Sequence, residues 1–397
     1  MKFELPCEVL FIIDRLESLG YRADVVGGPV RDFLLGNTPS DYDITTSALP
    51  EETKAAFADK RTVDTGIKHG TVSLVLEGGQ YEITTYRIDG EYKDSRHPEE
   101  VFFTKELELD LARRDFTMNA IAYSPTHGLT DVFGGRDDIS AGIIRTVGDP
   151  RVRFSEDALR ILRGVRFAAR LGFEIEENTR LAMLEGRDTL RLVSSERIFV
   201  ELKKLIEGDF AHGVLDSYRD IIFVVLPELL DLALPDEAAF YKAKPYVRLL
   251  SLFALSVENP SSAFSCAMRR LKSDNATRRT GEAVLSEISR HTLTTISDTT
   301  ELLSLLGEHG AGIFVELECV LGRFGERERE LLSEALNKKI PYRISDLAVT
   351  GDDLLALGLR GREIGESLEK LLSLVISGEL ANNKQDILSH LTRKTEN

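Results

Sequence analysis

Two aspartates one residue apart, Asp41 and Asp43, are the side chains near the start of the chain best suited to chemistry. In a strand, residues i and i+2 face the same side, so these carboxylates would point together and repel unless a cation separates them. Magnesium is the natural cation, because this hard ion prefers carboxylate and phosphate oxygens. Such a site suits in-line phosphoryl displacement. The alternative interpretation is a solvated acidic turn, which would contain the same two aspartates.

A glycine turn and an arginine precede the aspartates, in the segment GGPVRD at residues 27–32. The segment fits neither the dinucleotide fingerprint nor the P-loop fingerprint. A glycine pair at the end of a strand lets backbone N–H groups approach a triphosphate closely. Arg31 could reach the same phosphates with two parallel hydrogen bonds. A plain turn with a solvated arginine is the alternative, but the nearby aspartates favour a nucleotide site.

A second pattern lies in EDALRILRGVRF, where Asp157 and Arg160 are three residues apart and would be neighbours on one helix face. A carboxylate only accepts hydrogen bonds and a guanidinium only donates them. Cytosine and adenine present an amine donor beside a ring-nitrogen acceptor, whereas guanine and uracil present the reverse. The pair therefore complements C and A, although a surface ion pair of little energetic value is the alternative. Arg163 and Arg166 continue the row toward phosphates or the base edge.

The charge of the chain is unevenly distributed. The formal net charge is −16, which argues weakly against a nucleic-acid-binding protein. Residues 143–206 are different, with thirteen Lys and Arg against ten Asp and Glu. Upstream, the segment RRDFTMNA places Arg113 beside Arg114, and a double arginine can neutralise a triphosphate or a primer phosphate. A local basic surface within an acidic protein is therefore compatible with nucleotide or RNA binding.

Length and cysteine content limit the class of protein. A chain of 397 residues is long enough for two or more domains with their own cores. No apolar run reaches the roughly 18 residues of a membrane span, and the N-terminus has no signal-peptide pattern. The three cysteines are scattered and give neither a disulfide framework nor a zinc spacing. We therefore expect a cytoplasmic protein that does not bind membranes.

The elements that must position these residues change character along the chain. An amphipathic helix over residues 3–20, a buried strand at ADVVGG and a hairpin at TVSLVLEGGQYEITTYR predict a small domain of strands and helices over residues 1–140. LARRDFTMNAIAY has the apolar spacing of a helix. From RFSEDALRILRG onward helical periodicity dominates, with Ser155 suited to begin a helix and Gly172 to end it. The fold class is therefore α+β, a small mixed domain followed by helices.

Together these segments resemble the bacterial class II tRNA nucleotidyltransferases, the CCA-adding enzymes of the poly(A) polymerase and polymerase-β-like superfamily. The resemblance is carried, in the family's order and spacing, by GGPVRDFLLGNTPSDYDITT, RRDFTMNAIAY, DVFGGRDDI, EDALRILRGVRFAARLGF and SSERIFVELKKLI. It implies a catalytic head with a mixed sheet at residues 1–140. It also implies an all-helical remainder, with a neck at 141–207, a body at 208–337 and a tail at 338–397.

The resemblance also assigns roles to single residues. Asp41 and Asp43 would be catalytic and would bind Mg²⁺. Glu156 would orient Arg160, which together with Asp157 would read the base. The expected nucleotide-binding residues are Gly28, Arg31, Arg114, Asp157, Arg160, Arg163 and Arg166. Glu82 lies on a neighbouring expected strand. Whether it contributes a third carboxylate to the metal site is left open by the sequence. His69 and His97 have no partner pattern and are interpreted as structural or surface residues.

The implied reaction is template-independent addition of CCA to the tRNA 3′ end from CTP and ATP, with release of pyrophosphate. The acceptor and T arms of tRNA would be gripped by neck, body and tail. Addition of A alone, addition of CC alone and poly(A) synthesis are alternatives, and an inactive RNA-binding protein on the same fold is the non-enzymatic one. A full-length segment at residues 87–103 favours competence to add A, because CC-adding relatives have a shortened loop. The sequence leaves monomer and homodimer open.

Overall fold

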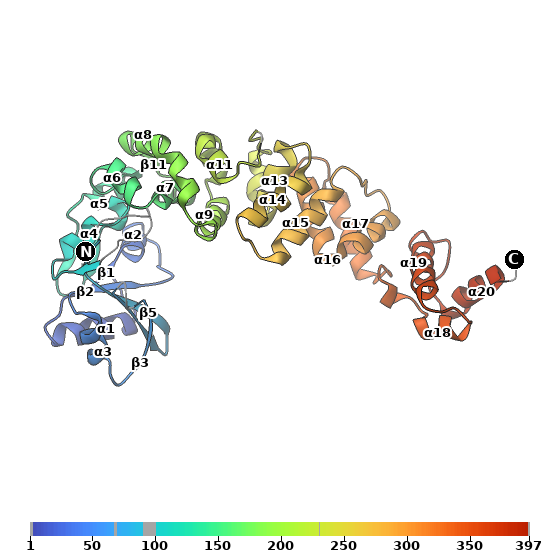
Figure 1. Cartoon of the computed structure of the whole chain (residues 1–397), viewed down its shortest axis with the longest axis horizontal. Coiled ribbons are helices and arrows are strands. Elements are labelled where there is room, and N and C mark those ends of the chain that lie inside the picture. Colours follow the sequence, from blue (N-terminus) through green and yellow to red (C-terminus); the bar gives the residue numbers. More distant parts are fainter. Residues whose placement is uncertain (1–2, 67–69, 90–100, 230, 396–397) are drawn as a thin grey trace. The chain divides into compact units, whose positions relative to one another are not determined.

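The computed structural model describes residues 3–66, 70–89, 101–229 and 231–395 of the chain (Figure 1). It divides into two compact units, residues 1–225 and residues 226–397. No helix in these described ranges is long and apolar enough to cross a membrane. His69, His97 and the greater part of the segment at 87–103 lie outside the described residues, so the expectations placed on them stay predictions.

A mixed sheet forms the centre of the first unit, in the strand order β3-β4-β5-β2-β1-β8-β9. Its strands are β1 (Ala23–Val26), β2 (Asp43–Thr46), β3 (Arg61–Gly66), β4 (Thr71–Leu76), β5 (Gly79–Thr85), β8 (Ala122–Ser124) and β9 (Gly128–Thr130). β2 and β5 pair in parallel, whereas the other neighbours pair antiparallel. The expected buried strand and the expected hairpin are both present.

Helices and short strands complete the first unit. The helices are α1 (Cys7–Ser18), α2 (Gly28–Leu34), α3 (Pro50–Ala56), α4 (Leu107–Ala112), η2 (Thr117–Asn119), α5 (Gly135–Ala141), α6 (Pro150–Glu156), α7 (Leu159–Leu171), α8 (Glu177–Gly186), η3 (Arg187–Leu192), α9 (Ser195–Glu207), α10 (Ala211–Ser217) and α11 (Arg219–Val225). Two small sheets pair β6 (Arg87–Asp89) with β7 (Val101–Phe103) and β10 (Ile143–Ile144) with β11 (Glu174–Ile175). The expected α+β fold class is therefore confirmed. The neck predicted at residues 141–207 is not all-helical, however, because β10 and β11 pair in parallel within it.

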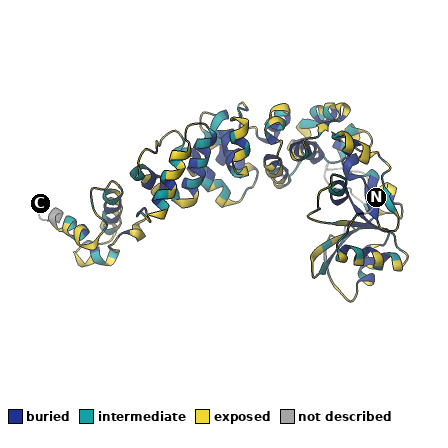
Figure 2. Ribbon diagram, turned by 180° about the vertical axis from the view of Figure 1, so that it is seen from behind, coloured by how far each residue is buried: buried dark blue, intermediate teal, exposed yellow. Residues whose placement is uncertain are grey.

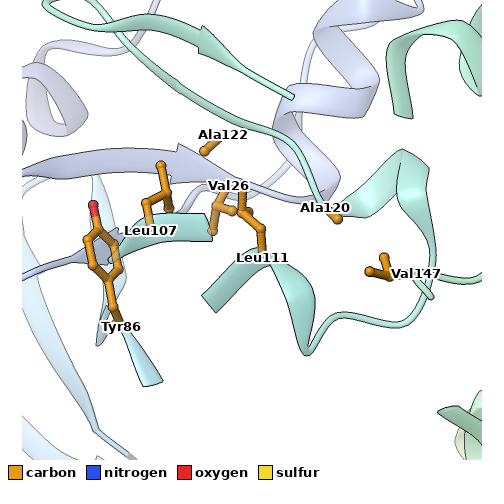
Figure 3. Packing of buried hydrophobic residues seen from close by; sticks show 7 residues of the cluster. All are labelled: Val26, Tyr86, Leu107, Leu111, Ala120, Ala122 and Val147. Atoms are coloured by element: carbon orange, nitrogen blue, oxygen red, sulfur yellow. The ribbon is translucent and has the colours of Figure 1, made fainter. Parts of the chain in front are cut away.

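A cluster of buried apolar side chains joins β1, α4 and β8 (Figure 3). Its members are Val26, Tyr86, Leu107, Leu111, Ala120, Ala122 and Val147. Val26 directly precedes the GGPVRD segment, and Leu111 lies one turn before the double arginine. Burial of such side chains contributes about 1.5–3 kcal/mol each. This core therefore holds the glycine turn and the arginine segment against each other.

The segment LARRDFTMNAIAY is not the helix that its apolar spacing predicts. Only Leu111 and Ala112 belong to α4, and the chain then continues through η2 into the strand β8. Phe116, Met118 and Ile121 are nevertheless fully buried. Their spacing reflects tertiary packing of an irregular segment rather than one face of a helix.

The helix expected from Ser155 to Gly172 is interrupted. α6 ends at Glu156, Asp157 has extended backbone angles (φ −144°, ψ 102°), and α7 begins at Leu159. Ser155 caps nothing, since its hydroxyl donates to the carbonyl of a residue in its own helix. Gly172 does end α7, with the left-handed backbone (φ +68°) that glycine favours. The break removes Asp157 from the regular helix face.

The second unit is helical. Its helices are α12 (Glu237–Lys242), α13 (Pro245–Ser256), α14 (Pro260–Arg270), α15 (Asn275–Glu287), α16 (Ile296–Val320), α17 (Glu326–Asn337), η4 (Ile344–Asp346), α18 (Gly351–Ala356), α19 (Arg362–Ile376) and α20 (Lys384–Thr395). Figure 2 shows buried faces on the central helices, where Phe253, Phe264 and Phe314 are fully buried. A separate apolar cluster joins α18, α19 and α20. The fourfold division at 140, 207 and 337 stays a prediction.

Gly135, in the DVFGGRDDI segment, tests how tightly α5 packs against η2. A Cβ atom at Gly135 would lie 2.1 Å from the carbonyl oxygen of Thr117, which is backbone and cannot swing away. Gly135→Ala should therefore lower the free energy of unfolding by about 1–3 kcal/mol through overpacking. Gly213→Ala, in α10 with open space around the glycine, should instead raise it by about 0.5–1 kcal/mol. Urea unfolding of both variants would measure this, and equal effects would contradict the close packing.

Candidate active site

Three carboxylates gather where β2 begins. Asp43 is the first residue of β2, whereas Asp41 precedes the strand, so only one of the two aspartates has the expected strand geometry. The parallel register pairs Asp43 directly with Glu82 of β5. Desolvation raises the pKa of Asp43, Arg114 lowers it, and the negative charges of Asp41 and Glu82 raise it further. Excess negative charge is therefore concentrated here.

The carboxylate oxygens at this position are suitable ligands for a magnesium ion that binds together with a nucleotide. Among residues 3–66, 70–89, 101–229 and 231–395, no three His, Cys, Asp or Glu side chains are arranged to hold a metal by themselves. Magnesium usually takes only one or two carboxylates from the protein and completes its octahedron with water and substrate phosphates. The repulsion between Asp41 and Asp43 would be relieved by a cation.

The GGPVRD segment forms the end of β1 and the start of α2. Gly27 has a left-handed backbone (φ +79°), and a Cβ atom there would lie 2.9 Å from Nη1 of Arg114. A glycine is therefore needed for Arg114 to lie against this turn. Gly28 begins α2. Arg31 is buried, and its guanidinium donates to Asn119 Oδ1 at 2.8 Å and to Asp32 Oδ1 at 2.7 Å, which contradicts the solvated-arginine alternative.

A buried carboxylate behind the site holds the double arginine. Asp110 is fully buried and accepts a hydrogen bond from Arg113 Nε at 2.9 Å, while Arg114 lies 3.5 Å from its other oxygen. Burial lowers the pKa of Arg114, whereas the charges of Asp110 and Asp43 raise it. Arg114 thus lies within the electrostatic field of Asp43.

Asp115 connects the RRDFTMNA segment to α7. Its Oδ2 accepts a hydrogen bond from Arg163 Nε at 2.8 Å, and its Oδ1 accepts one from Asn119 Nδ2 at 3.1 Å. Because Asn119 also accepts from Arg31, a continuous chain of polar contacts links α2 to α7. Burial alone would raise the pKa of Asp115, but Arg163, Asn119 and the Phe116 N–H lower it to about 2. Asp115 and Asn119 lie in the RRDFTMNA motif, but the sequence pattern alone indicates no role for either residue.

Three arginines surround one aromatic ring on α7. The guanidinium carbons of Arg31, Arg163 and Arg166 lie 5.3, 5.5 and 3.7 Å from the centroid of Phe167. Burial lowers the pKa of Arg166 to about 10, so this arginine remains charged at neutral pH. Glu201 of α9 forms an ion pair of 2.6 Å with Arg166. The ring and the carboxylates hold together positive charges that would otherwise repel, and such a cluster suits polyphosphate binding.

The predicted template residues do not share one helix face. Arg160 is held by Glu156 at 2.6 Å and donates to the carbonyl of Arg113 at 2.9 Å, consistent with an orienting role for Glu156. Asp157 instead forms an ion pair of 2.7 Å with Arg197 of α9. The expectation that Asp157 and Arg160 share one helix face is therefore wrong, because the break between α6 and α7 turns Asp157 toward α9. The alternative of a surface ion pair between Asp157 and Arg160 is not formed either, since Asp157 pairs with Arg197. Arg197 lies in the segment SSERIFVELKKLI, and its contact with Asp157, 40 residues away, was not predicted from the sequence.

Known proteins are similar in sequence to this chain over nearly its full length. The family described as "Poly A polymerase head domain" matches residues 23–145, and "Probable RNA and SrmB- binding site of polymerase A" matches residues 172–230. The CCA-adding enzyme of Enterococcus faecalis is 36% identical, with 96% of this chain and 94% of that protein covered. The CCA-adding enzyme of Geobacillus sp. is 38% identical, with 96% and 95% covered. This chain belongs to the CCA-adding enzyme family.

Solved structures agree with that membership. The CCA-adding enzyme of Bacillus stearothermophilus in complex with CTP has a TM-score of 0.81 and 32% identity, covering 99% of this chain and 98% of that one. A Thermotoga maritima CCA-adding enzyme complexed with tRNA shares the fold, with a TM-score of 0.67 and 22% identity over 98% and 96%. The resemblance recognised in the motifs is therefore confirmed over the full length of this CCA-adding family member.

The depressed pKa of Asp115 makes a pH-dependent contribution to stability. A carboxylate with a pKa of about 2 in the folded chain, against about 3.9 unfolded, stabilises by about 2 kcal/mol above pH 4 and loses this as the pH falls through 2. Asp115→Asn should therefore destabilise by about 2 kcal/mol or more at pH 6, and by about 1 kcal/mol less at pH 3. Urea unfolding at both values measures the difference.

Asp188→Asn is the control, because this exposed aspartate pairs only loosely with Arg191 at 3.4 Å. It should change stability by less than about 1 kcal/mol at either pH. A destabilisation by Asp115→Asn that is the same at pH 6 and pH 3 would contradict the ionic role of Asp115.

Proposed function

We propose that this chain adds C, C and A in turn to the 3′ end of tRNA, using CTP and ATP and releasing pyrophosphate. Full-length similarity to CCA-adding enzymes supports the reaction. One observation in the structure carries the proposal for this chain's own residues. The Asp115 network joins Arg31 of α2 to Arg163 on the helix that follows Asp157. Phosphate-binding and base-reading groups are thereby held at fixed positions relative to each other.

The head residues position the reacting groups. When bound at Asp41 and Asp43, Mg²⁺ would supply Lewis-acid activation of the tRNA 3′-hydroxyl and of the phosphates. Glu82 is placed by its register with Asp43 to complete the negative charge of this site. Arg31 and Arg114, together with the backbone at Gly28, would bind the triphosphate. The 3′-oxygen forms a bond to the α-phosphorus, the bond to pyrophosphate breaks, and the hydroxyl proton passes to solvent.

The neck residues select the base. Asp157 would accept the exocyclic amine of C or A, and Arg160, fixed by Glu156, would donate to the adjacent ring nitrogen. Uracil and guanine would place a carbonyl against the carboxylate and an N–H against the guanidinium, which leaves buried groups unpaired at about 1–3 kcal/mol each. Arg163 and Arg166 would add phosphate contacts or a further base contact. Base choice would thus depend on amino acids rather than on a nucleic-acid template.

The partners follow from the same proposal. The acceptor and T arms of tRNA would contact neck, body and tail mainly through their phosphates, so binding should weaken as salt rises. Reaction in the cytoplasm stays a prediction, and the choice between monomer and homodimer stays open. Competence to add A also stays a prediction, because residues 90–100 of the segment on which it rests lie outside the described residues.

Removal of either catalytic carboxylate should stop nucleotide transfer. Asp41→Asn and Asp43→Asn should each lower kcat for CTP incorporation by roughly 100-fold or more, because each loses a charged magnesium ligand. Binding of tRNA in a filter assay should be unchanged. Asp59→Asn is the matched control, since this aspartate is exposed and pairs with Arg15. Retention of more than a tenth of the activity by Asp43→Asn would contradict the proposed site.

The reaction itself is tested with tRNA transcripts that end before the first C, after the second C and after the terminal A. Each is incubated with Mg²⁺ and labelled CTP or ATP, separately and together. The proposal expects two C and then one A on the shortest transcript, and no addition to the complete one. Addition of A alone would identify an A-adding enzyme, and two C without A would identify a CC-adding enzyme. No incorporation would favour the inactive RNA-binding protein.

A further inference from the structure

The ion pair between Asp157 and Arg197 crosses from the break after α6 to the first turn of α9. Arg197 Nη2 donates to Asp157 Oδ2 at 2.7 Å, and Nη1 lies 3.3 Å from Oδ1. Such a two-point contact fixes both the position and the plane of a carboxylate. The first-turn residue Arg197 therefore determines where the Asp157 oxygens lie.

Asp157 is restrained from a second direction. Its Oδ1 also accepts the backbone N–H of Leu159 at 3.1 Å, at the start of α7. An ionised carboxylate can accept about four hydrogen bonds. The three contacts from Arg197 and Leu159 leave room for one further donor. Asp157 keeps partial solvent access, with 16% of its side chain exposed, so that donor can come from a bound molecule.

The neighbouring cations show what Arg197 prevents. Arg160 lies three residues after Asp157 in the sequence, on the far side of the break between α6 and α7. The negative charge of Asp157 also acts on Arg163. A carboxylate released from Arg197 could swing to one of these arginines. Donor and acceptor would then satisfy each other, and neither would be available to a base edge.

The same face of α9 supports α7 one turn later. Glu201 lies four residues after Arg197 and pairs with Arg166 at 2.6 Å, deep in the packed interface between the two helices. Arg197 is therefore carried on a rigid element that is itself fixed to the arginine helix. A side chain on such an element can hold a partner in one orientation better than a side chain on a loop.

We propose that Arg197 is a positioning residue for base selection. Its guanidinium holds the Asp157 carboxylate in the orientation that accepts the exocyclic amine of C or A, and keeps it from pairing with Arg160. This inference rests on the proposed function, because it assigns Arg197 to the same base-reading group. Arg197 itself contacts Asp157 and would act on the base only through this carboxylate.

The test compares kcat/KM for CTP with UTP on a transcript that lacks CCA, and for ATP with GTP on a transcript that ends in CC. Arg197→Ala should lower both selectivity ratios by about tenfold or more, mainly by raising KM for the correct nucleotide. Arg197→Lys, which keeps the charge but loses the two-point contact, should recover part of the selectivity. Arg180→Ala is the control, since Arg180 forms an exposed pair with Glu177 at 2.8 Å.

A double-mutant cycle separates positioning from a general structural effect. In an Asp157→Ala background, Arg197→Ala should produce no further loss of selectivity, because the carboxylate that it positions is absent. Equal proportional losses for correct and wrong nucleotides, or a selectivity loss that persists in the Asp157→Ala background, would overturn the proposal. Failure of the unsubstituted chain to incorporate CTP would instead contradict the proposed function itself, so the two failures are distinguishable.

Discussion

The buried carboxylate of Asp115 is the contact on which the arrangement of the site depends. It accepts hydrogen bonds from Arg163 on α7 and from Asn119, which in turn accepts from Arg31 on α2. Removing a charge from water is costly, and here several strong partners offset that cost. A single carboxylate thus relates Arg31, which we propose binds phosphate, to Arg163 on the helix that follows Asp157.

The site also resolves an apparent conflict between the acidic chain and its anionic substrates. Arg31, Arg163 and Arg166 are held around Phe167, and the buried acids Asp115 and Glu201 pair with Arg163 and Arg166. The overall charge of −16 describes the surface average, whereas the proposed nucleotide binding would depend on this local cluster. Oriented arginines of this kind need little rearrangement when a polyphosphate binds, which favours rapid and selective catalysis.

The residues with local chemical patterns could be predicted from the sequence, whereas contacts between distant segments could not. The aspartate pair, the glycine turn and the acidic–basic segment carry the resemblance to nucleotidyltransferases, because they keep the family's order and spacing. The adjacency of Asp43 and Glu82 depends on the parallel register of β2 with β5, which periodicity does not specify. The pair of Asp157 with Arg197 spans 40 residues and depends on a helix break. Tertiary packing also replaced the helix expected after Leu111 with a turn and a strand.

Direct binding of nucleotides to the protein without tRNA tests the central claim, that amino-acid side chains select the base. Calorimetric titration with CTP, ATP, UTP and GTP in the presence of Mg²⁺ would measure the four dissociation constants under one condition. The account predicts that CTP and ATP bind at least about tenfold more tightly than UTP and GTP, since the wrong bases leave hydrogen-bonding groups unpaired. Four equal dissociation constants would contradict it, because selection would then require the tRNA.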